Sequence, residues 1–134
     1  MPLKLNLKKG QKIIINGAVL ENTVDRSVSL MLLNDAAILR DNDILTAEEA
    51  STPASRVYFS IQCAYLFEND RVKHLAEYRT FLDDFLQAIP SSAEVGEEIR
   101  NAIEKEEYYL ALRAARKLID TETEIIKDNF GETV

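Results

Sequence analysis

The pattern of apolar residues changes near residue 46 of this 134-residue chain. Before that point, short aliphatic runs alternate with turn residues, and after it apolar side chains recur at helical spacing. The change predicts an α+β protein, with a small antiparallel β-meander over residues 1–45 and a bundle of about four helices over residues 46–134. No linker rich in proline or glycine separates the two parts, so we expect them to share one core.

The first part has the alternation and the turn residues of short strands. Leu3, Leu5 and Leu7 alternate with polar residues, which places three leucines on one face of a strand. Asn16-Gly17 separates two β-prone runs, and both residues tolerate the positive φ of a type I′ hairpin. The predicted strands cover residues 3–7, 13–15, 18–20, 27–33 and 36–40.

A sheet of this size buries little apolar surface by itself. Folded units below about 40 residues usually need a disulfide, a metal or a partner. The chain has one cysteine, Cys63, and one histidine, His74, which leaves no basis for an intrachain disulfide or a Cys/His zinc site. The sheet must therefore pack against the helices, pair with a second copy of the chain, or both.

The second part carries several helix start and stop signals. Thr46 and Glu49 have the spacing of a capping box, and Thr52-Pro53 offers a second start. We expect further helices to begin at Asp70, at Ser91 or Ser92 after Pro90, and near Glu107, with residues 129–134 as a frayed tail. The predicted core stripes are Val57, Ile61, Ala64 and Tyr65; Leu75, Tyr78, Leu82, Phe85, Leu86 and Ile89; Val95, Ile99, Ala102 and Ile103; and Tyr108, Leu112, Ala115, Ile119 and Ile126.

Membrane and secretory signals are missing from the sequence. No apolar run approaches the roughly 18 to 20 residues that a membrane-spanning helix needs. The residues after Met1 alternate between polar and apolar types, unlike a signal peptide. We therefore expect a soluble cytoplasmic protein.

No constellation of residues predicts catalysis or a cofactor. His74 lies among charged residues and is expected on the surface, whereas Cys63 lies in an apolar stretch and is expected in the core. The acidic pairs after residue 96 are typical of solvated helix faces. The segment Asp41-Asn42-Asp43 begins like a calcium loop but lacks its glycine and terminal glutamate. The sequence predicts a protein that is not an enzyme and holds no metal or cofactor.

The net charge of −7 is distributed unevenly along the chain. Residues 1–45 hold six basic and five acidic side chains, and the other residues hold 10 basic and 18 acidic ones. Two basic groups could attract phosphates: Lys4, Lys8, Lys9 and Lys12 near the N-terminus, and Arg113, Arg116 and Lys117 on one helix face. Alternatively, the first group protects an exposed sheet edge, and the second pairs within its helix with Glu107, Asp120 or Glu124.

Three pairs of segments resemble one family of bacterial regulators. They are residues 3–10 (LKLNLKKG) with 13–19 (IIINGAV), residues 38–45 (ILRDNDIL) with 52–59 (TPASRVYF), and residues 108–112 (YYLAL) with 116–119 (RKLI). In this order they are similar to the FlbT family of alphaproteobacterial flagellar regulators. The resemblance implies post-transcriptional control of flagellin through the 5′ untranslated leader of its mRNA, with a FlaF-type regulator as a partner.

A more distant resemblance suggests which residues contact RNA. Residues 8–15 resemble the first turn and following strand of the carbon-storage regulator (CsrA-like) family, and residues 38–41 resemble its last strand. That family forms intertwined dimers that bind RNA along the first and last strands. The resemblance implies a CsrA-like meander and a homodimer formed through it. The implied RNA-binding residues are Lys4, Lys8, Lys9 and Arg40, with Arg26 at the periphery.

Together these features predict a non-catalytic regulator that binds the flagellin mRNA leader and alters its translation or stability. The sequence leaves open whether the regulation represses or activates. The alternative is a protein–protein adaptor, in which the helical part binds FlaF, flagellin or export components and the lysines only increase solubility.

Overall fold

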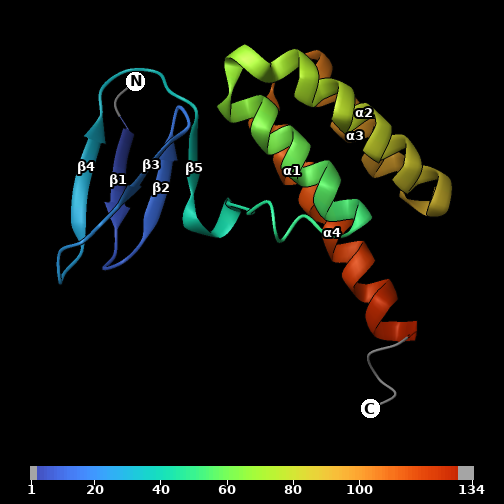
Figure 1. Ribbon diagram of the computed structural model, residues 1–134, viewed down its shortest axis with the longest axis horizontal. Helices are drawn as coiled ribbons and strands as arrows, with labels where there is room; N and C mark the ends of the chain where they lie inside the picture. Colours follow the sequence, from blue (N-terminus) through green and yellow to red (C-terminus); the bar gives the residue numbers. More distant parts are fainter. Residues whose placement is uncertain (1–2, 130–134) are drawn as a thin grey trace. The chain divides into compact units, whose positions relative to one another are not determined.

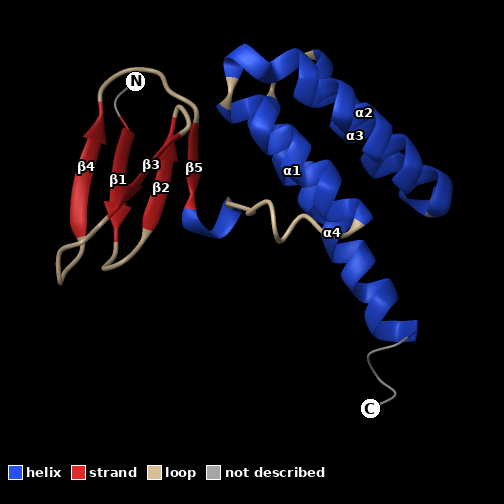
Figure 2. Cartoon of the chain, in the orientation of Figure 1, coloured by secondary structure: helices blue, strands red, loops and turns tan. Residues whose placement is uncertain are grey.

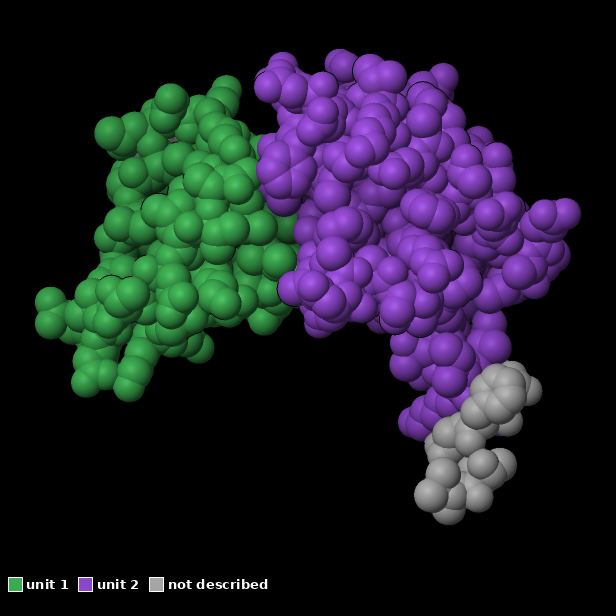
Figure 3. Space-filling model, in the orientation of Figure 1, with its two compact units in different colours: residues 1–44 green, residues 45–134 purple. Residues whose placement is uncertain are grey.

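The computed structural model describes residues 3–129, which form five strands followed by four α-helices (Figures 1 and 2). The α+β class and the order of its two parts are therefore confirmed. The chain divides into two compact units, residues 1–44 and residues 45–134 (Figure 3).

The β unit contains two small antiparallel sheets. Its strands are β1 (Leu3–Leu7), β2 (Lys12–Ile15), β3 (Ala18–Glu21), β4 (Val28–Leu32) and β5 (Ile38–Arg40). β1 pairs with β4, and the other sheet has the order β3–β2–β5. The predicted hairpin at Asn16-Gly17 is confirmed, with φ values of 51° and 85°. The remaining pairs join strands that are not consecutive in the chain, so long-range contacts set the topology.

Strand alternation creates the core of the β unit. Leu5 and Leu7 of β1 are buried together with Ile13 of β2. Half-buried aliphatic side chains pack around these three: Ile15, Val28, Leu32 and Ile38. The alternating leucines predicted near the N-terminus thus supply one layer of this core, and the isoleucines of the hairpin supply the other.

Asn22 ties two connections together at one end of the β unit. Its side chain is buried, and its Nδ2 donates hydrogen bonds to the carbonyl oxygens of Leu7 (3.0 Å) and Arg26 (2.9 Å). Its Oδ1 accepts a hydrogen bond from the Val24 N–H at 2.9 Å. The Gly10 N–H also donates to the Asn22 carbonyl oxygen at 2.9 Å, at a positive φ of 76° that suits glycine. The β1–β2 turn and the β3–β4 loop are therefore fixed against each other.

The helical unit contains α1 (Pro53–Leu66), α2 (Arg71–Ala88), α3 (Ala93–Glu104) and α4 (Tyr108–Asn129). α1 packs mainly against α2 and α4, and α3 packs mainly against α4. The predicted number of helices is confirmed. The largest fully buried side chains of this unit are Val57, Tyr58, Ile61, Leu82, Phe85, Ile99, Leu112 and Leu118.

The two predicted helix starts, a capping box at Thr46 and Glu49 and an N-cap at Thr52 before Pro53, have different outcomes. Thr52 caps α1 as predicted, with the Ser55 N–H donating to Thr52 Oγ1 at 3.2 Å and the Thr52 N–H donating to Ser55 Oγ at 2.8 Å. Thr46 and Glu49 also bond reciprocally, at 2.9 and 3.2 Å. Residues 47–49 nevertheless form only a turn, and the first α-helix begins at Pro53. Two hydrogen bonds from Thr46 lower the pKa of the Glu49 carboxyl group.

The end of α4 departs from its predicted stripe. Ile126 was predicted to face the core, but it is exposed. The buried Glu122 carboxylate accepts a hydrogen bond from the Ala54 N–H in the first turn of α1 (3.0 Å), so α4 has already reached the end of α1 at this residue. Beyond Glu122, α4 extends past the start of α1 (Figure 1), and Ile126 lies on this last part of α4. Of the predicted frayed tail, Asn129 ends α4, and residues 130–134 lie outside the described residues.

Candidate nucleic-acid interface

Five basic residues lie at one end of the β unit. β1 ends at the Lys8–Gln11 turn and β2 begins there, so Lys8, Lys9 and Lys12 share this end. Arg40 ends β5 opposite Ile13, which brings it beside the start of β2. Arg26 is in the loop that Asn22 holds against the turn. We call this set the basic end: Lys8, Lys9, Lys12, Arg26 and Arg40. It lies where the tip of the β1 arrow and the start of β2 meet in Figure 1.

Lys4 is separate from the basic end. It precedes Leu7 by three residues, which corresponds to about 10 Å along a strand. It lies opposite Met31 of β4, on the face away from the buried Leu5. The structure thus brings four of the five predicted RNA-binding residues to one end, and it leaves Lys4 on the outer face of the first sheet.

The turn between β1 and β2 holds Lys8 and Lys9 outward. The Gln11 N–H donates to the Lys8 carbonyl oxygen at 3.0 Å, and the Lys8 N–H donates to Gln11 Oε1 at 2.9 Å. These two bonds use the backbone groups of the turn, and both lysine side chains are exposed. The ammonium groups are therefore accessible to an anionic ligand.

Most charges of the basic end have no ionic partner among the residues that the structure describes. Lys9 Nζ lies 2.8 Å from Asp25 Oδ1, but both side chains are largely exposed, so this pair contributes little and a phosphate can displace it. Within residues 3–129, no carboxylate lies within salt-bridge distance of Lys8, Lys12 or Arg40. The carboxylates at the same end of the unit are Glu21, Asp25, Asp41 and Asp43. The basic end therefore carries only a small net positive charge. A ligand can reach its cations because their side chains are exposed.

A small cavity of about 150 Å³ opens beside Arg40. Aliphatic residues of β1 and β2 line it together with amide and charged residues: Leu5, Asn6, Leu7, Gln11, Lys12, Ile13, Arg40, Asp41 and Asn42. The planar guanidinium group of Arg40 can bind an anion or a base edge in bidentate fashion. Lys12 joins Arg40 here, although the resemblance did not assign it to the site. The sequence contained Lys12 in its first basic group, but the pairing of β2 with β5 could not be read from it.

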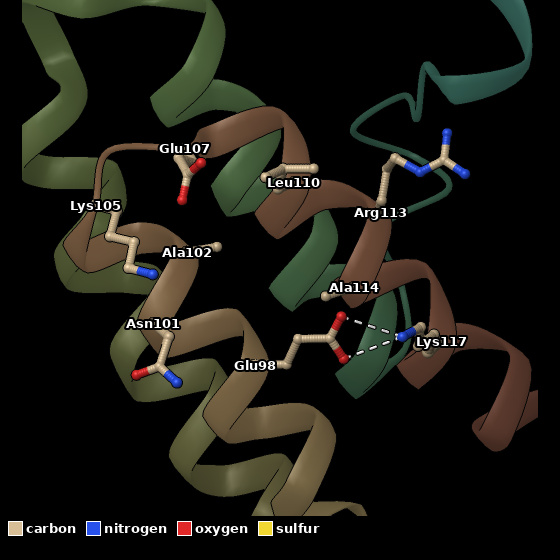
Figure 4. Close-up of a pocket in the computed structure, with 9 residues that line it drawn as sticks. All are labelled: Glu98, Asn101, Ala102, Lys105, Glu107, Leu110, Arg113, Ala114 and Lys117. Atoms are coloured by element: carbon tan, nitrogen blue, oxygen red, sulfur yellow. Dashed lines mark hydrogen bonds and ion pairs between the residues drawn. The ribbon is translucent and has the colours of Figure 1, made fainter.

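The second basic group is largely engaged within the helical unit. Lys117 Nζ lies 3.0 and 3.1 Å from the two carboxylate oxygens of Glu98 on α3 (Figure 4). The guanidinium carbon of Arg116 lies 4.7 Å from the centre of the Tyr58 ring, in a cation–π contact. Arg113 extends away from the Glu98–Lys117 pair. Although these residues lie along one helix, the structure gives each a different environment.

A pocket of about 490 Å³ lies between α3 and α4, where Figure 4 shows its lining residues. Lys105, Arg113 and Lys117 line it with Glu98 and Glu107, so positive and negative groups are mixed on its walls. Leu110 is half exposed at its edge.

The single histidine and cysteine have structural surroundings. His74 lies in the first turn of α2, half-buried, with Nδ1 2.9 Å from Glu77 Oε1. The prediction of an exposed histidine was therefore wrong, because the His74 side chain is only 17% exposed. Cys63 is buried as predicted, and burial raises the pKa of its thiol to about 11. Among residues 3–129, no three His, Cys, Asp or Glu side chains are grouped so that they could hold a metal ion. None of the described helices is long and apolar enough to cross a bilayer.

These features define a two-unit α+β protein whose β unit presents accessible cations at one end. Comparison with known sequences gives its family. The model of the family described as "Flagellar protein FlbT" matches residues 3–126. The chain belongs to the FlbT family.

Relatives from several bacteria match nearly the whole chain. A probable flagellum biosynthesis repressor protein FlbT from Caulobacter sp. (strain K31) is 40% identical, over 91% of this chain and 94% of the relative. The flagellum biosynthesis repressor protein FlbT of Caulobacter vibrioides is 39% identical, over 92% of this chain and 89% of the relative. A probable repressor of the same name from Rhodopseudomonas palustris is also 39% identical, over 94% and 98%. No solved structure matches the chain significantly.

Proposed function

We propose that this protein is a cytoplasmic, non-catalytic regulator of flagellin synthesis that binds the 5′ untranslated leader of flagellin mRNA. Its relatives are named repressors of flagellum biosynthesis, which supports a regulatory role. The observation that carries the RNA part of the proposal is the basic end, with its exposed cations and the cavity beside Arg40. Binding there alters translation or stability of the message.

The chemistry of the basic end favours a single-stranded or looped target. Side chains cannot read the deep groove of duplex RNA, whereas they reach the bases and phosphates of unpaired segments. Residues 1–44 contain no aromatic side chain on which a base could stack. Affinity must therefore come from phosphate contacts of the lysines, and base discrimination must come from the Arg40 guanidinium group and the amides near it.

A gel-shift titration of the flagellin leader over a series of salt concentrations tests this proposal. The triple variant Lys8→Ala, Lys12→Ala, Arg40→Ala removes three accessible cations from the basic end. Each lost phosphate contact should reduce the slope of log affinity against log salt by about 0.7, or roughly 2 for three contacts. The matched control Lys73→Ala, Arg79→Ala, Lys127→Ala removes two lysines and one arginine, all exposed, from the helical unit, and it should bind like the wild type.

Two outcomes would count against RNA binding at the basic end. One is a wild-type protein that does not shift the leader at low salt. The other is an equal loss of affinity in the triple variant and in the control, which would mean that total charge governs binding. The single variant Lys4→Ala should have a smaller effect than Arg40→Ala, since Lys4 lies apart on the outer face of the sheet.

A second candidate function is a protein adaptor that binds a FlaF-type regulator, flagellin or an export component. The observation in its favour is a pocket of about 720 Å³ between α2 and α3, whose lining includes Leu75, Leu82 and Ile103. Isothermal titration with purified FlaF distinguishes the two candidates. Tight FlaF binding by the triple alanine variant, without RNA binding by the wild type, favours the adaptor.

A further inference from the structure

The consecutive helices α2 and α3 share little direct packing. α2 packs mainly on α1, and α3 packs mainly on α4. The two helices meet at Gly96, where a Cβ atom would lie 2.5 Å from Leu86 Cδ1. The pocket of about 720 Å³ between them has all of its α2 lining before Leu86 and all of its α3 lining after Gly96. It therefore lies farther from the joining turn than this close contact.

The pocket follows about two turns of each helix. Its lining runs from Leu75 to Asp83 on α2 and from Glu97 to Glu104 on α3, which is roughly 12 Å and 10 Å at 1.5 Å per residue. Apolar and aromatic side chains of these helices and of the start of α4 contribute to the lining: Leu75, Tyr78, Leu82, Ile103 and Tyr108. The pocket thus offers apolar surface over the length of a short helix.

Acidic side chains outnumber basic ones around this pocket. Its lining includes four carboxylates and two guanidinium groups: Asp83, Glu97, Glu104, Glu106, Arg79 and Arg100. Arg100 is engaged, with Nη2 2.8 Å from Asp83 Oδ1 and Nη1 3.8 Å from Glu97 Oε2. Among residues 3–129, no basic group lies within salt-bridge distance of Glu104 or Glu106. The pocket therefore carries unpaired negative charge, which repels RNA and attracts a cationic ligand.

Glu106 holds one of these charges in an unfavourable backbone conformation. It follows α3 with a φ of 60°, a left-handed conformation that glycine adopts at less cost. Its N–H donates to the Ile103 carbonyl oxygen at 2.9 Å, and a glycine could make the same backbone bond. The turn itself does not require a carboxylate here. The Glu106 side chain is therefore available for a role other than forming the turn.

A helix is the form of polypeptide that suits this pocket. The backbone groups of α2 and α3 are bonded within the helices, so an extended peptide would find no strand edge to pair with. A helix satisfies its own backbone and can present apolar residues on one face with charged residues beside them. We infer that this pocket binds an amphipathic α-helix of a partner protein, with aliphatic residues against the pocket and lysine or arginine beside Glu104 and Glu106.

This inference goes beyond RNA binding and does not depend on it. It concerns a surface of the helical unit whose charge is opposite to that of the basic end. It also gives the adaptor candidate the chemistry and the secondary structure that its partner must have.

Fluorescence anisotropy with a labelled model peptide tests the inference on the full-length protein. The probe is a peptide of about 15 leucine and lysine residues, with its leucines on one helix face. The wild-type protein should bind this peptide with a Kd below about 100 µM. A permuted peptide of the same composition, with leucines spread around the helix, should bind at least about tenfold more weakly.

Variants of the pocket identify the charges that bind the peptide. The double variant Glu104→Gln, Glu106→Gln should weaken binding about fivefold, as expected for the loss of two exposed ion pairs. The matched control Glu48→Gln, Glu124→Gln removes two exposed glutamates that do not line the pocket, and it should bind like the wild type.

Glu106→Gly separates binding from folding. The glycine suits the φ of 60°, so thermal unfolding should occur at or above the wild-type temperature. The variant should nevertheless bind the amphipathic peptide about 2- to 3-fold more weakly, because it lacks one carboxylate. Amide chemical shifts of the wild-type protein, measured during peptide titration, should change most within residues 75–83 and 97–106.

Four results would overturn the inference. The first is a wild-type protein that does not bind the amphipathic peptide at up to about 1 mM. The second is equal binding of the permuted peptide, which would mean that charge attraction alone is measured. The third is an equal loss in the double variant and its control, and the fourth is a set of chemical-shift changes outside the pocket. None of these measurements involves RNA, so their outcome is separate from that of the proposed function.

Discussion

A single buried amide organises the end of the β unit that carries the candidate site. Asn22 makes three side-chain hydrogen bonds, each to the backbone of the β1–β2 turn region or of its own loop. An alanine at this position would leave the Leu7 carbonyl oxygen without this bond in a buried environment. The cost of such an orphaned group usually exceeds the net gain of the bond itself.

We predict that Asn22→Ala lowers the free energy of unfolding by about 1–3 kcal/mol. Urea denaturation followed by circular dichroism measures this change. Thr23→Ala, at the exposed neighbouring residue, should change stability by less than about 0.5 kcal/mol. Equal effects of the two substitutions would show that the amide network does not hold the loop.

Cys63 is expected to react slowly with thiol reagents in the folded protein. Burial raises its pKa to about 11, so at pH 8 the thiolate is roughly 100-fold less populated than for a thiol of pKa 9. Kinetics with a chromogenic disulfide should therefore show a slow phase that becomes fast in denaturant. The raised pKa also means that the Cys63 thiol keeps its proton to a higher pH in the folded state than in the unfolded state. The free energy of unfolding should therefore fall as the pH rises from about 9 to 11. A fast native reaction at pH 8 would contradict the burial.

At the scale of elements, side chains both near and far in the sequence stabilise the N-terminus of α1. Thr52 and Ser55 satisfy backbone groups of the first turn locally. Glu122, from the far helix α4, accepts the hydrogen bond of the Ala54 N–H, and its negative charge is favourable at a helix N-terminus. Only the first of these contributions is visible as a sequence motif.

We predict that Thr52→Ala destabilises the protein by about 1 kcal/mol, because it removes the N-cap. Thermal unfolding by calorimetry measures this effect. Thr80→Ala is the matched control: Thr80 is exposed within α2, where alanine is the better helix former, so the change should be neutral or stabilising. A destabilisation as large at Thr80 as at Thr52 would exclude the cap as the cause.

At the scale of the whole molecule, the two units differ in how much core they contain. The helical unit buries many large side chains among four helices. The β unit buries only a few large side chains in sheets of two and three strands: Leu5, Leu7, Ile13, Ile14 and Leu39. Sheets this small are marginal without further packing.

A chain of residues 45–134 alone should therefore fold into a helical unit that unfolds cooperatively. Residues 1–44 alone should lack a cooperative transition at low concentration, since so small a core does not offset the entropy of ordering the chain. Far-ultraviolet circular dichroism with thermal melts checks both fragments. An unfolded helical fragment, or an independently stable β fragment at low concentration, would reverse this assignment.

Much of the fold could be predicted because it depends on neighbouring residues. The Asn16-Gly17 hairpin, the start of α1 at Thr52-Pro53 and the stop at Pro90 follow from local backbone preferences. The Thr46–Glu49 motif shows the limit of such signals, because its hydrogen bonds form without a helix. A cap satisfies free amides, but helix propagation depends on the residues that follow.

The candidate site could be predicted only in part. The sequence contained its lysines and Arg40, but pairing between distant strands decided which of them share one end of the β unit. For this reason Lys12, which was not assigned to the site, lies beside Arg40, whereas Lys4, which was assigned to it, lies apart. In the second basic group, Glu98 on a preceding helix neutralises Lys117, a contact 19 residues apart in the chain.

The sequence by itself determined the class of fold, the element types and the supply of positive charge in the first 45 residues, because propensity, turn chemistry and composition act locally. The tertiary structure alone decided that β1 pairs with β4, that Arg40 lies beside Lys12, and that Leu20 and Leu30 face the core yet stay exposed. These features depend on which distant segments meet. The free energy of such contacts comes from burial and backbone pairing summed over the whole unit. A short segment of sequence therefore does not determine it.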